Sequence, residues 1–138
     1  MESQIAAGAV KDKGMTQENA TTNAWAPPII WAVVICFFSV FPTGNLEMIS
    51  IGYADKVAHF LLYFILGALM IKAYGRIEGL TFRKSLSFTL ILGGVYGILL
   101  ELVQIPVPGR NAEVYDVAAN IIGIVSGIIL GRILLWQK

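Results

Sequence analysis

Charge, cysteine and histidine are scarce in this chain of 138 residues. Only 14% of the residues are charged, the net charge is +1, and Cys36 and His59 are the single cysteine and the single histidine. One cysteine excludes an intrachain disulfide and a thiolate metal site, and one histidine excludes a His-rich metal cage. The small net charge, without a long basic run, argues against a nucleic-acid partner. We therefore expect no nucleic acid, no cofactor and no metal, and we interpret Cys36 as a buried small hydrophobic side chain.

Apolar sequence is abundant. Hydrophobic residues make up 57% of the chain and the mean hydropathy is +0.72, which is typical of a membrane protein. Four apolar stretches, at about residues 25–41, 55–74, 81–105 and 113–136, have lengths near that of a membrane-spanning helix. The sequence therefore predicts an all-α membrane protein. We expect an up-and-down bundle of four transmembrane helices within residues 25–138, preceded by a flexible polar tail at 1–24.

Polar residues and prolines mark several of the expected helix ends. Asp55 is a candidate N-cap of the second stretch, and Thr81 is a candidate N-cap of the third, because their side-chain oxygens can accept hydrogen bonds from free amides of the first turn. Pro106 and Pro108 follow the third stretch and predict its end. The connections are short, as an antiparallel bundle requires.

The distribution of Lys and Arg predicts the orientation. In a four-span bundle, the N-terminal tail, the 72–84 segment and the C-terminus share one side and carry eight Lys or Arg residues, whereas the other side has only Lys56 and Arg110. Positively charged loops stay in the cytoplasm, so both termini are expected there. We thus predict a multi-pass protein of the cytoplasmic membrane, with the polar helix ends on its extracytoplasmic side.

Polar side chains recur at helical spacing near those outward ends. Asp55, His59 and Tyr63 follow one another every four residues and so share one helix face. Ionisable groups at membrane depth are costly and usually serve a function. The candidate ligand-binding residues are Asp55, Lys56, His59, Glu101, Gln104, Arg110, Asp116 and Asn120.

Three of these residues are also candidate catalytic groups. His59, Glu101 and Asp116 can each act as a general acid or base, and His59 can equally relay protons or bind phosphate. Its position shows no diagnostic spacing for a metal. Arg110 follows a stiff proline-rich turn and is suited to a phosphate or a carboxylate.

A purely structural role for the charges is the alternative. Glu101 would then pair with Arg110 or Lys56, and Arg110 would form a surface salt bridge to Glu113 or Asp116. Because intramembrane hydrogen bonds contribute only about 0.6–2 kcal/mol, we favour a binding or catalytic pocket over helix joining alone.

Glycines at four-residue spacing lie deeper in the third and fourth stretches. They are Gly93 and Gly97 in the third stretch and Gly123, Gly127 and Gly131 in the fourth. Small residues at this spacing allow helix backbones to approach closely, so we interpret them as packing positions and not as ligand contacts. Close packing here would bring the polar ends together.

The polar positions also resemble a known family. In order along the chain they form Asp55-Lys56-x-x-His59-Phe60, Glu101-x-x-Gln104, Pro108-Gly109-Arg110 and Asp116-x-x-x-Asn120-x-x-Gly123. This pattern, over about residues 55–131, is similar to that of the VanZ-like family of small bacterial membrane proteins. The resemblance implies a cell-envelope role and, for some members, an association with low-level resistance to the glycopeptide teicoplanin. It implies no established reaction.

These observations together predict an outward-facing polar pocket that binds an anionic envelope lipid or a glycan-lipid precursor. Arg110, Lys56 and the protonated form of His59 would contact the anion. Two alternatives stay open: a membrane-embedded enzyme acting on a lipid-linked phosphate, and a structural or assembly subunit of an envelope complex. Besides lipids, a membrane-protein partner or a second copy of the chain is compatible with this reading.

Overall fold

The computed structural model describes residues 23–41, 53–108, 110 and 112–134. Within these residues the chain forms helices and no strand: Asn23–Val40, α2 (Ala54–Gly75), α3 (Phe82–Gln104) and α4 (Val114–Leu134). All four are long and apolar enough to cross a membrane, so the predicted all-α, four-span fold is confirmed. The described helix ends lie close to the predicted ones. Residues 1–22 of the expected tail and the expected last turn at 135–136 lie outside the described residues.

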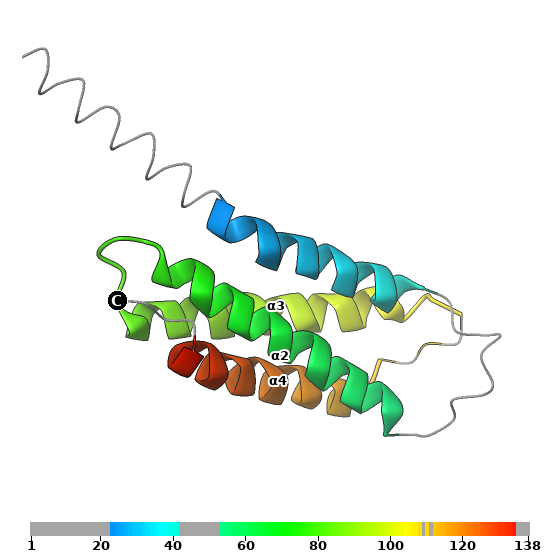
Figure 1. Cartoon of the computed structure of the whole chain (residues 1–138). Coiled ribbons are helices and arrows are strands. Elements are labelled where there is room, and N and C mark those ends of the chain that lie inside the picture. The colour runs from blue at the N-terminus through cyan, green and yellow to red at the C-terminus, as the bar shows by residue number, and fades with distance from the viewer. Residues whose placement is uncertain (1–22, 42–52, 109, 111, 135–138) are drawn as a thin grey trace, which may run out of the picture.

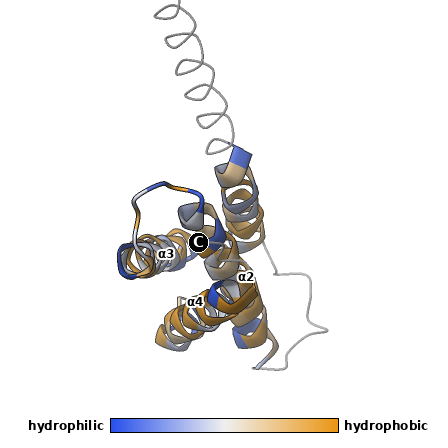
Figure 2. Ribbon diagram, turned by 60° about the vertical axis from the view of Figure 1, so that its left-hand side comes forward, coloured by the Kyte–Doolittle hydropathy of each residue, from blue (hydrophilic) through white to orange (hydrophobic). Residues whose placement is uncertain are grey.

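The four helices run alternately up and down (Figure 1). The starts of α2 and α4 and the end of α3 meet at one end of the bundle, while the start of the Asn23–Val40 helix and the end of α4 lie toward the other. Figure 2 shows hydrophobic residues along most of the helices and hydrophilic residues mainly near their ends. This arrangement brings polar side chains that are distant in sequence to one end of the molecule.

The closest helix contact joins α2 to α4 through glycine. Gly123 and Gly127 lie so near the α2 backbone that a Cβ atom on either would overlap the carbonyl oxygen of Phe60 or Phe64. The other glycines that the sequence assigned to packing face side chains: Gly131 lies against Ile71, Gly93 against Ile124 and Gly97 against Asn120. Only glycine permits backbones to approach this closely.

The Asn23–Val40 helix is held by two hydrogen bonds from aromatic side chains. Trp31 Nε1 donates to the Leu62 carbonyl oxygen at 2.8 Å, and the Tyr96 hydroxyl donates to the Ala32 carbonyl oxygen at 2.6 Å. Ile35, a residue of this helix, is completely buried in the hydrophobic core. Cys36 is only partly buried against the hydrophobic core, whereas the sequence predicted a buried side chain.

Of the two predicted N-caps, one is confirmed and one is wrong. The Thr81 hydroxyl accepts from the Lys84 backbone N–H at 3.5 Å and caps α3. Asp55 does not cap α2, because Tyr53 already has helical φ and ψ angles and the helix begins at Ala54. Asp55 therefore lies in the first turn, where its charge still suits the helix dipole and its carboxylate is free to contact other parts of the chain.

Candidate functional site

A group of polar side chains gathers where α2, α3 and α4 meet. We call it the polar cluster; it consists of Asp55, Lys56, His59, Glu101, Gln104, Arg110, Asp116 and Asn120, which are the site residues selected from the sequence. Five of them are at most 6% exposed: His59, Glu101, Gln104, Asp116 and Asn120. The residues at helical spacing face inward because the glycines on the same faces of α3 and α4 contact neighbouring helices.

His59 lies at the centre of the polar cluster. Its Nδ1 atom is 3.0 Å from Asn120 Oδ1 and 3.6 Å from Glu101 Oε1, and its Nε2 atom is 4.0 Å from Asp55 Oδ1. Because an amide oxygen can only accept a hydrogen bond, Asn120 places the hydrogen on Nδ1. In the neutral imidazole, Nε2 then carries the lone pair and can accept a proton or bind a cation.

The two fixed cations pair differently from the alternatives considered for the sequence. Lys56 Nζ lies 2.8 Å from Glu113 Oε2 and 3.5 Å from Asp116 Oδ1, and Arg110 Nη1 lies 3.1 Å from Asp55 Oδ1. The expected pairs of Arg110 with Glu113 or Asp116 are therefore wrong. Arg110 extends toward the start of α2, which leaves the carboxylates at the start of α4 to Lys56.

The pairing expected for Glu101 is also wrong. The ion-pair neighbour of Glu101 is His59, in place of Arg110 or Lys56. Among the described residues, neither carboxylate oxygen of Glu101 has a hydrogen-bond partner, and the same holds for Oδ1 of Asp116. Buried carboxylates in this state need a cation, a proton or a donor from a ligand.

The charges of the polar cluster do not balance. The fixed cations are Lys56 and Arg110, and the carboxylates around them are Asp55, Glu101, Glu113 and Asp116. Negative charge is therefore in excess here whenever these carboxylates are ionised and the imidazole is neutral. An excess of buried charge at membrane depth is unfavourable without a partner.

A cavity of about 350 Å³ opens beside this cluster. Its lining residues are Phe38, Ser39, Asp55, Ala58, His59, Leu61, Leu62, Gln104 and Arg110. Two of them carry buried N–H donors without a partner among the described residues, namely Arg110 Nε and Gln104 Nε2. Phe38 and Leu61 give the cavity an apolar wall that is half-exposed at the protein surface. Lys56 does not line the cavity. Its ammonium group forms ion pairs with Glu113 and Asp116 instead.

The Asn23–Val40 helix contributes to the site, which the sequence reasoning missed. Phe38 and Ser39 line the cavity, and Arg110 Nη2 donates to the Phe38 carbonyl oxygen at 2.9 Å. The one signal in the sequence is Ser39, a polar residue near the end of an apolar stretch that is only 5% exposed in the fold. A backbone carbonyl acceptor leaves no mark in the sequence.

Comparison with known proteins identifies a matching family. A family model described as VanZ/LLP1 matches residues 13–135, which is nearly the whole chain and extends beyond the 55–131 region that carries the motifs. None of the curated proteins and none of the solved structures matches.

Proposed function

The chain belongs to the VanZ/LLP1 family, and we propose that its polar cluster binds the anionic headgroup of an envelope lipid or of a lipid-linked glycan precursor. The observation that carries this proposal is the cavity beside the cluster, in which the unpaired donors Arg110 Nε and Gln104 Nε2 adjoin an apolar wall. Guanidinium and amide donors fit phosphate oxygens, and the wall fits the first carbons of a lipid chain.

The remaining groups suit the rest of such a headgroup. Glu101 and Asp116 do not line the cavity but lie beside His59. Their oxygens that lack a hydrogen-bond donor among the described residues would accept from hydroxyl or ammonium groups of a headgroup that extends past the imidazole. Phe38 and Leu61 are 54% and 50% exposed, so a chain leaving the cavity along them enters the lipid phase directly. The site thus combines polar recognition with an open path to the membrane.

The location of the site belongs to the same proposal. The positive-inside rule assigns the segment between α2 and α3 to the cytoplasm, and the polar cluster lies at the opposite end of the bundle. The cluster then faces the extracytoplasmic side of the cytoplasmic membrane, where envelope precursors are exposed. A role of this chain in teicoplanin susceptibility requires that the cluster face outward. It is tested by comparing the teicoplanin susceptibility of a deletion strain with that of the parent strain.

Mass spectrometry of copurified lipids tests the binding. Wild-type, Arg110→Gln and Arg110→Lys proteins are extracted in mild detergent, and their bound lipids are identified. We expect Arg110→Gln to lose most of the anionic lipid that wild type retains and Arg110→Lys to retain an intermediate amount. Arg83→Gln, which removes an exposed arginine from the start of α3, is the matched control. Equal lipid content in the Arg110→Gln and wild-type proteins would contradict the proposal.

An enzyme acting on a lipid-linked phosphate is the second candidate function. It is favoured by the contact of His59 with Glu101, since a buried imidazole beside a carboxylate is suited to general acid or base chemistry. Purified protein is incubated with polyprenyl phosphates and glycerophospholipids, and product formation is compared with that of Glu101→Gln.

A structural subunit is the remaining alternative. It predicts that variants of the polar cluster lose protein abundance, while any protein that survives is fully functional.

A further inference from the structure

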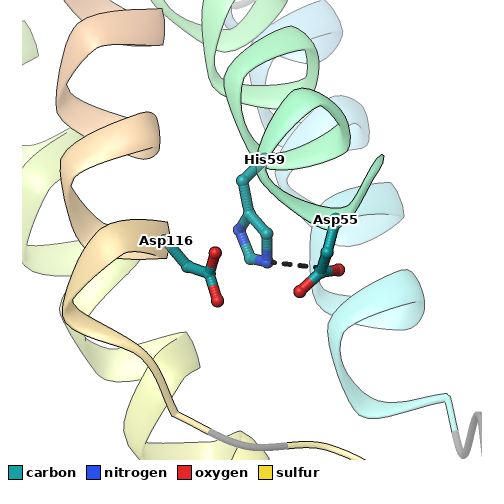
Figure 3. A group of neighbouring side chains, drawn as sticks. All are labelled: Asp55, His59 and Asp116. Atoms are coloured by element: carbon teal, nitrogen blue, oxygen red, sulfur yellow. Dashed lines mark ion pairs between the residues drawn. The ribbon is translucent and has the colours of Figure 1, made fainter. Parts of the chain in front are cut away.

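Asp55, His59 and Asp116 bring three potential metal ligands together. Each offers one ligand atom, and these atoms all lie within 4.8 Å of one another. Figure 3 shows the imidazole between the two carboxylates, with Asp55 and His59 projecting from α2 and Asp116 from α4. Asp116 is 1% exposed and His59 6%, whereas the side chain of Asp55 is 48% exposed at the rim. The group is therefore buried on one side and accessible on the other.

The hydrogen bonds of His59 prepare the imidazole for a metal. A histidine that binds a metal through one ring nitrogen usually donates the other N–H to an oxygen acceptor, which fixes the tautomer. Asn120 Oδ1, 3.0 Å from Nδ1, supplies that acceptor. The lone pair of Nε2 then faces the Asp55 carboxylate, only 4.0 Å from its Oδ1 atom. A neutral imidazole and a carboxylate in this orientation repel each other, and a proton on Nε2 or a metal ion between them would remove the repulsion, beyond the charge that Arg110 already places 3.1 Å from the same Oδ1 atom.

In the described part of the chain, two buried carboxylates have oxygens that lack hydrogen-bond donors, although Lys56 Nζ lies 3.5 Å from Asp116 Oδ1 and His59 lies beside Glu101. Asp116 Oδ1 and both oxygens of Glu101 have no hydrogen-bond partner among the described residues, although both side chains are more than nine-tenths buried. Glu101 Oε1 faces the imidazole at 3.6 Å. A divalent cation would neutralise the excess negative charge of the cluster that Lys56 and Arg110 leave unbalanced.

We propose that Asp55, His59 and Asp116 bind a divalent metal ion of the Zn²⁺ class, with Glu101 as a neighbouring carboxylate. Zn²⁺ accepts both imidazole nitrogen and carboxylate oxygen at about 2.0–2.2 Å, and three protein ligands leave a position open for another group. Ligands at this distance lie at most about 4 Å apart, so small side-chain rotations bring the three atoms into range. The proposed metal site does not require that the chain bind lipid. The proposal replaces our expectation from the sequence that the chain binds no metal.

Sequence spacing did not predict this site because its ligands come from two helices. Asp55 and His59 are one turn apart on α2, which by itself is a common pattern on any helix. Asp116 joins them only through the close packing of α4 on α2 at Gly123 and Gly127. Lys56 Nζ, 3.5 Å from Asp116 Oδ1, is a competing cation that Glu113 holds at 2.8 Å.

Metal titration of the purified full-length chain tests the proposal. Protein with a tag that contains no histidine is depleted of metal with a chelator and titrated with Zn²⁺ by calorimetry, while bound metal is counted by elemental analysis. We expect about one Zn²⁺ per chain, a higher melting temperature with Zn²⁺, and a loss of affinity of at least about tenfold in Asp55→Asn, His59→Gln and Asp116→Asn. Glu78→Gln, the same charge change at an exposed site in the segment after α2, should match wild type.

If the His59→Gln and Asp116→Asn proteins do not fold, the Zn²⁺ affinity of Asp55→Asn alone tests the proposal. The side chain of Asp55 is half-exposed, so the substitution leaves the core unchanged, and the melting temperature of the metal-free protein verifies this. X-ray absorption of the Zn²⁺-loaded protein should show one imidazole among oxygen ligands. Wild-type protein without stoichiometric Zn²⁺, or an Asp55→Asn protein with wild-type affinity, would overturn the proposal. Lipid copurification is measured separately, so either idea can fail alone.

Discussion

Arg110 Nη1 lies 3.1 Å from Asp55 Oδ1, across 55 positions of the sequence. The other terminal nitrogen of the same guanidinium donates to the carbonyl oxygen of Phe38 at 2.9 Å. One side chain therefore joins the Asn23–Val40 helix, the start of α2 and the segment between α3 and α4. On the other side of the cluster, Lys56 and Glu113 connect α2 to the residue before α4 at 2.8 Å. These two contacts connect the helix ends around the cavity and the proposed metal ligands.

The Arg110–Asp55 pair should contribute little to stability. Its side chains are 17% and 48% exposed, and ion pairs of this kind contribute about 0–1 kcal/mol. A double-mutant cycle with Arg110→Ala and Asp55→Ala, measured by unfolding in mixed micelles, should therefore give a coupling free energy below about 1 kcal/mol. A coupling of several kcal/mol would mean that the pair holds the fold together and would weaken its assignment to ligand binding.

The packing of α4 on α2 should fail when glycine is replaced. A Cβ atom at Gly127 would overlap the Phe64 carbonyl oxygen, so Gly127→Ala must separate the two helices. We expect Gly127→Ala to lower the melting temperature and to displace Asp116 from His59, which would weaken Zn²⁺ binding as well. Gly94→Ala is the matched control, since no atom lies within 4 Å of its Cβ position. Alanine also favours the helix there by about 1 kcal/mol, so this variant should be at least as stable as wild type. Equal melting temperatures for the two variants would contradict the packing argument.

The sequence predicted the helices better than it predicted the contacts between them. Apolar length is a local property, which explains why the four spans and the Thr81 cap were found correctly. Four-residue spacing also identified the inward face that carries His59, because that periodicity is fixed by the helix itself. Which carboxylate each cation contacts depends on how far each helix is rotated and shifted. The partners expected for Arg110 and Glu101 were wrong for this reason.

The role of Asp55 shows the same limit. An aspartate at the start of an apolar run is a good N-cap signal, but the backbone of Tyr53 is already helical and moves the cap away from it. The freed carboxylate approaches His59, as their four-residue spacing on one helix face predicts, and it contacts Arg110, which no local pattern predicts. A residue whose position in the sequence is fully accounted for by a local role, such as an N-cap, can therefore still belong to the polar cluster.

The Asn23–Val40 helix should depend on its aromatic hydrogen bonds. Its residues Ile30 and Val33 are more than half exposed, so few side chains anchor it to the bundle. Tyr96→Phe removes the hydrogen bond to the Ala32 carbonyl oxygen and should lower the free energy of unfolding by about 0.6–1.7 kcal/mol. Tyr115→Phe, at a side chain that is 74% exposed, should have no effect. The two variants are compared by unfolding in mixed micelles, and an unchanged Tyr96→Phe protein would contradict this account.

The orientation of the bundle can be measured by labelling single cysteines. In a Cys36→Ala background, Ala112→Cys places a thiol in the exposed segment before α4, and Glu78→Cys places one in the exposed segment after α2. Because Lys and Arg residues concentrate around the segment after α2, a membrane-impermeant maleimide added to intact cells should label position 112 and not position 78. Permeabilised cells should label both. Labelling of position 78 alone in intact cells would place the polar cluster in the cytoplasm and contradict the proposed function.

Asn120 should act as a positioning residue for the proposed metal. Its Oδ1 atom accepts the Nδ1–H of His59 at 3.0 Å and so directs the lone pair of Nε2 toward Asp55. Asn120→Leu keeps a similar volume but removes the acceptor, and loss of such an outer partner typically lowers metal affinity by about 10–100-fold. Asn120→Asp keeps an acceptor oxygen and should retain most of the affinity, because a carboxylate orients a metal-bound histidine at least as well as an amide. Zn²⁺ titration and melting temperatures of the metal-free variants separate this effect from a loss of folding. If Asn120→Leu and Asn120→Asp lose affinity equally while both remain folded, the hydrogen bond to His59 neither orients the imidazole nor fixes the tautomer that the proposed metal site requires.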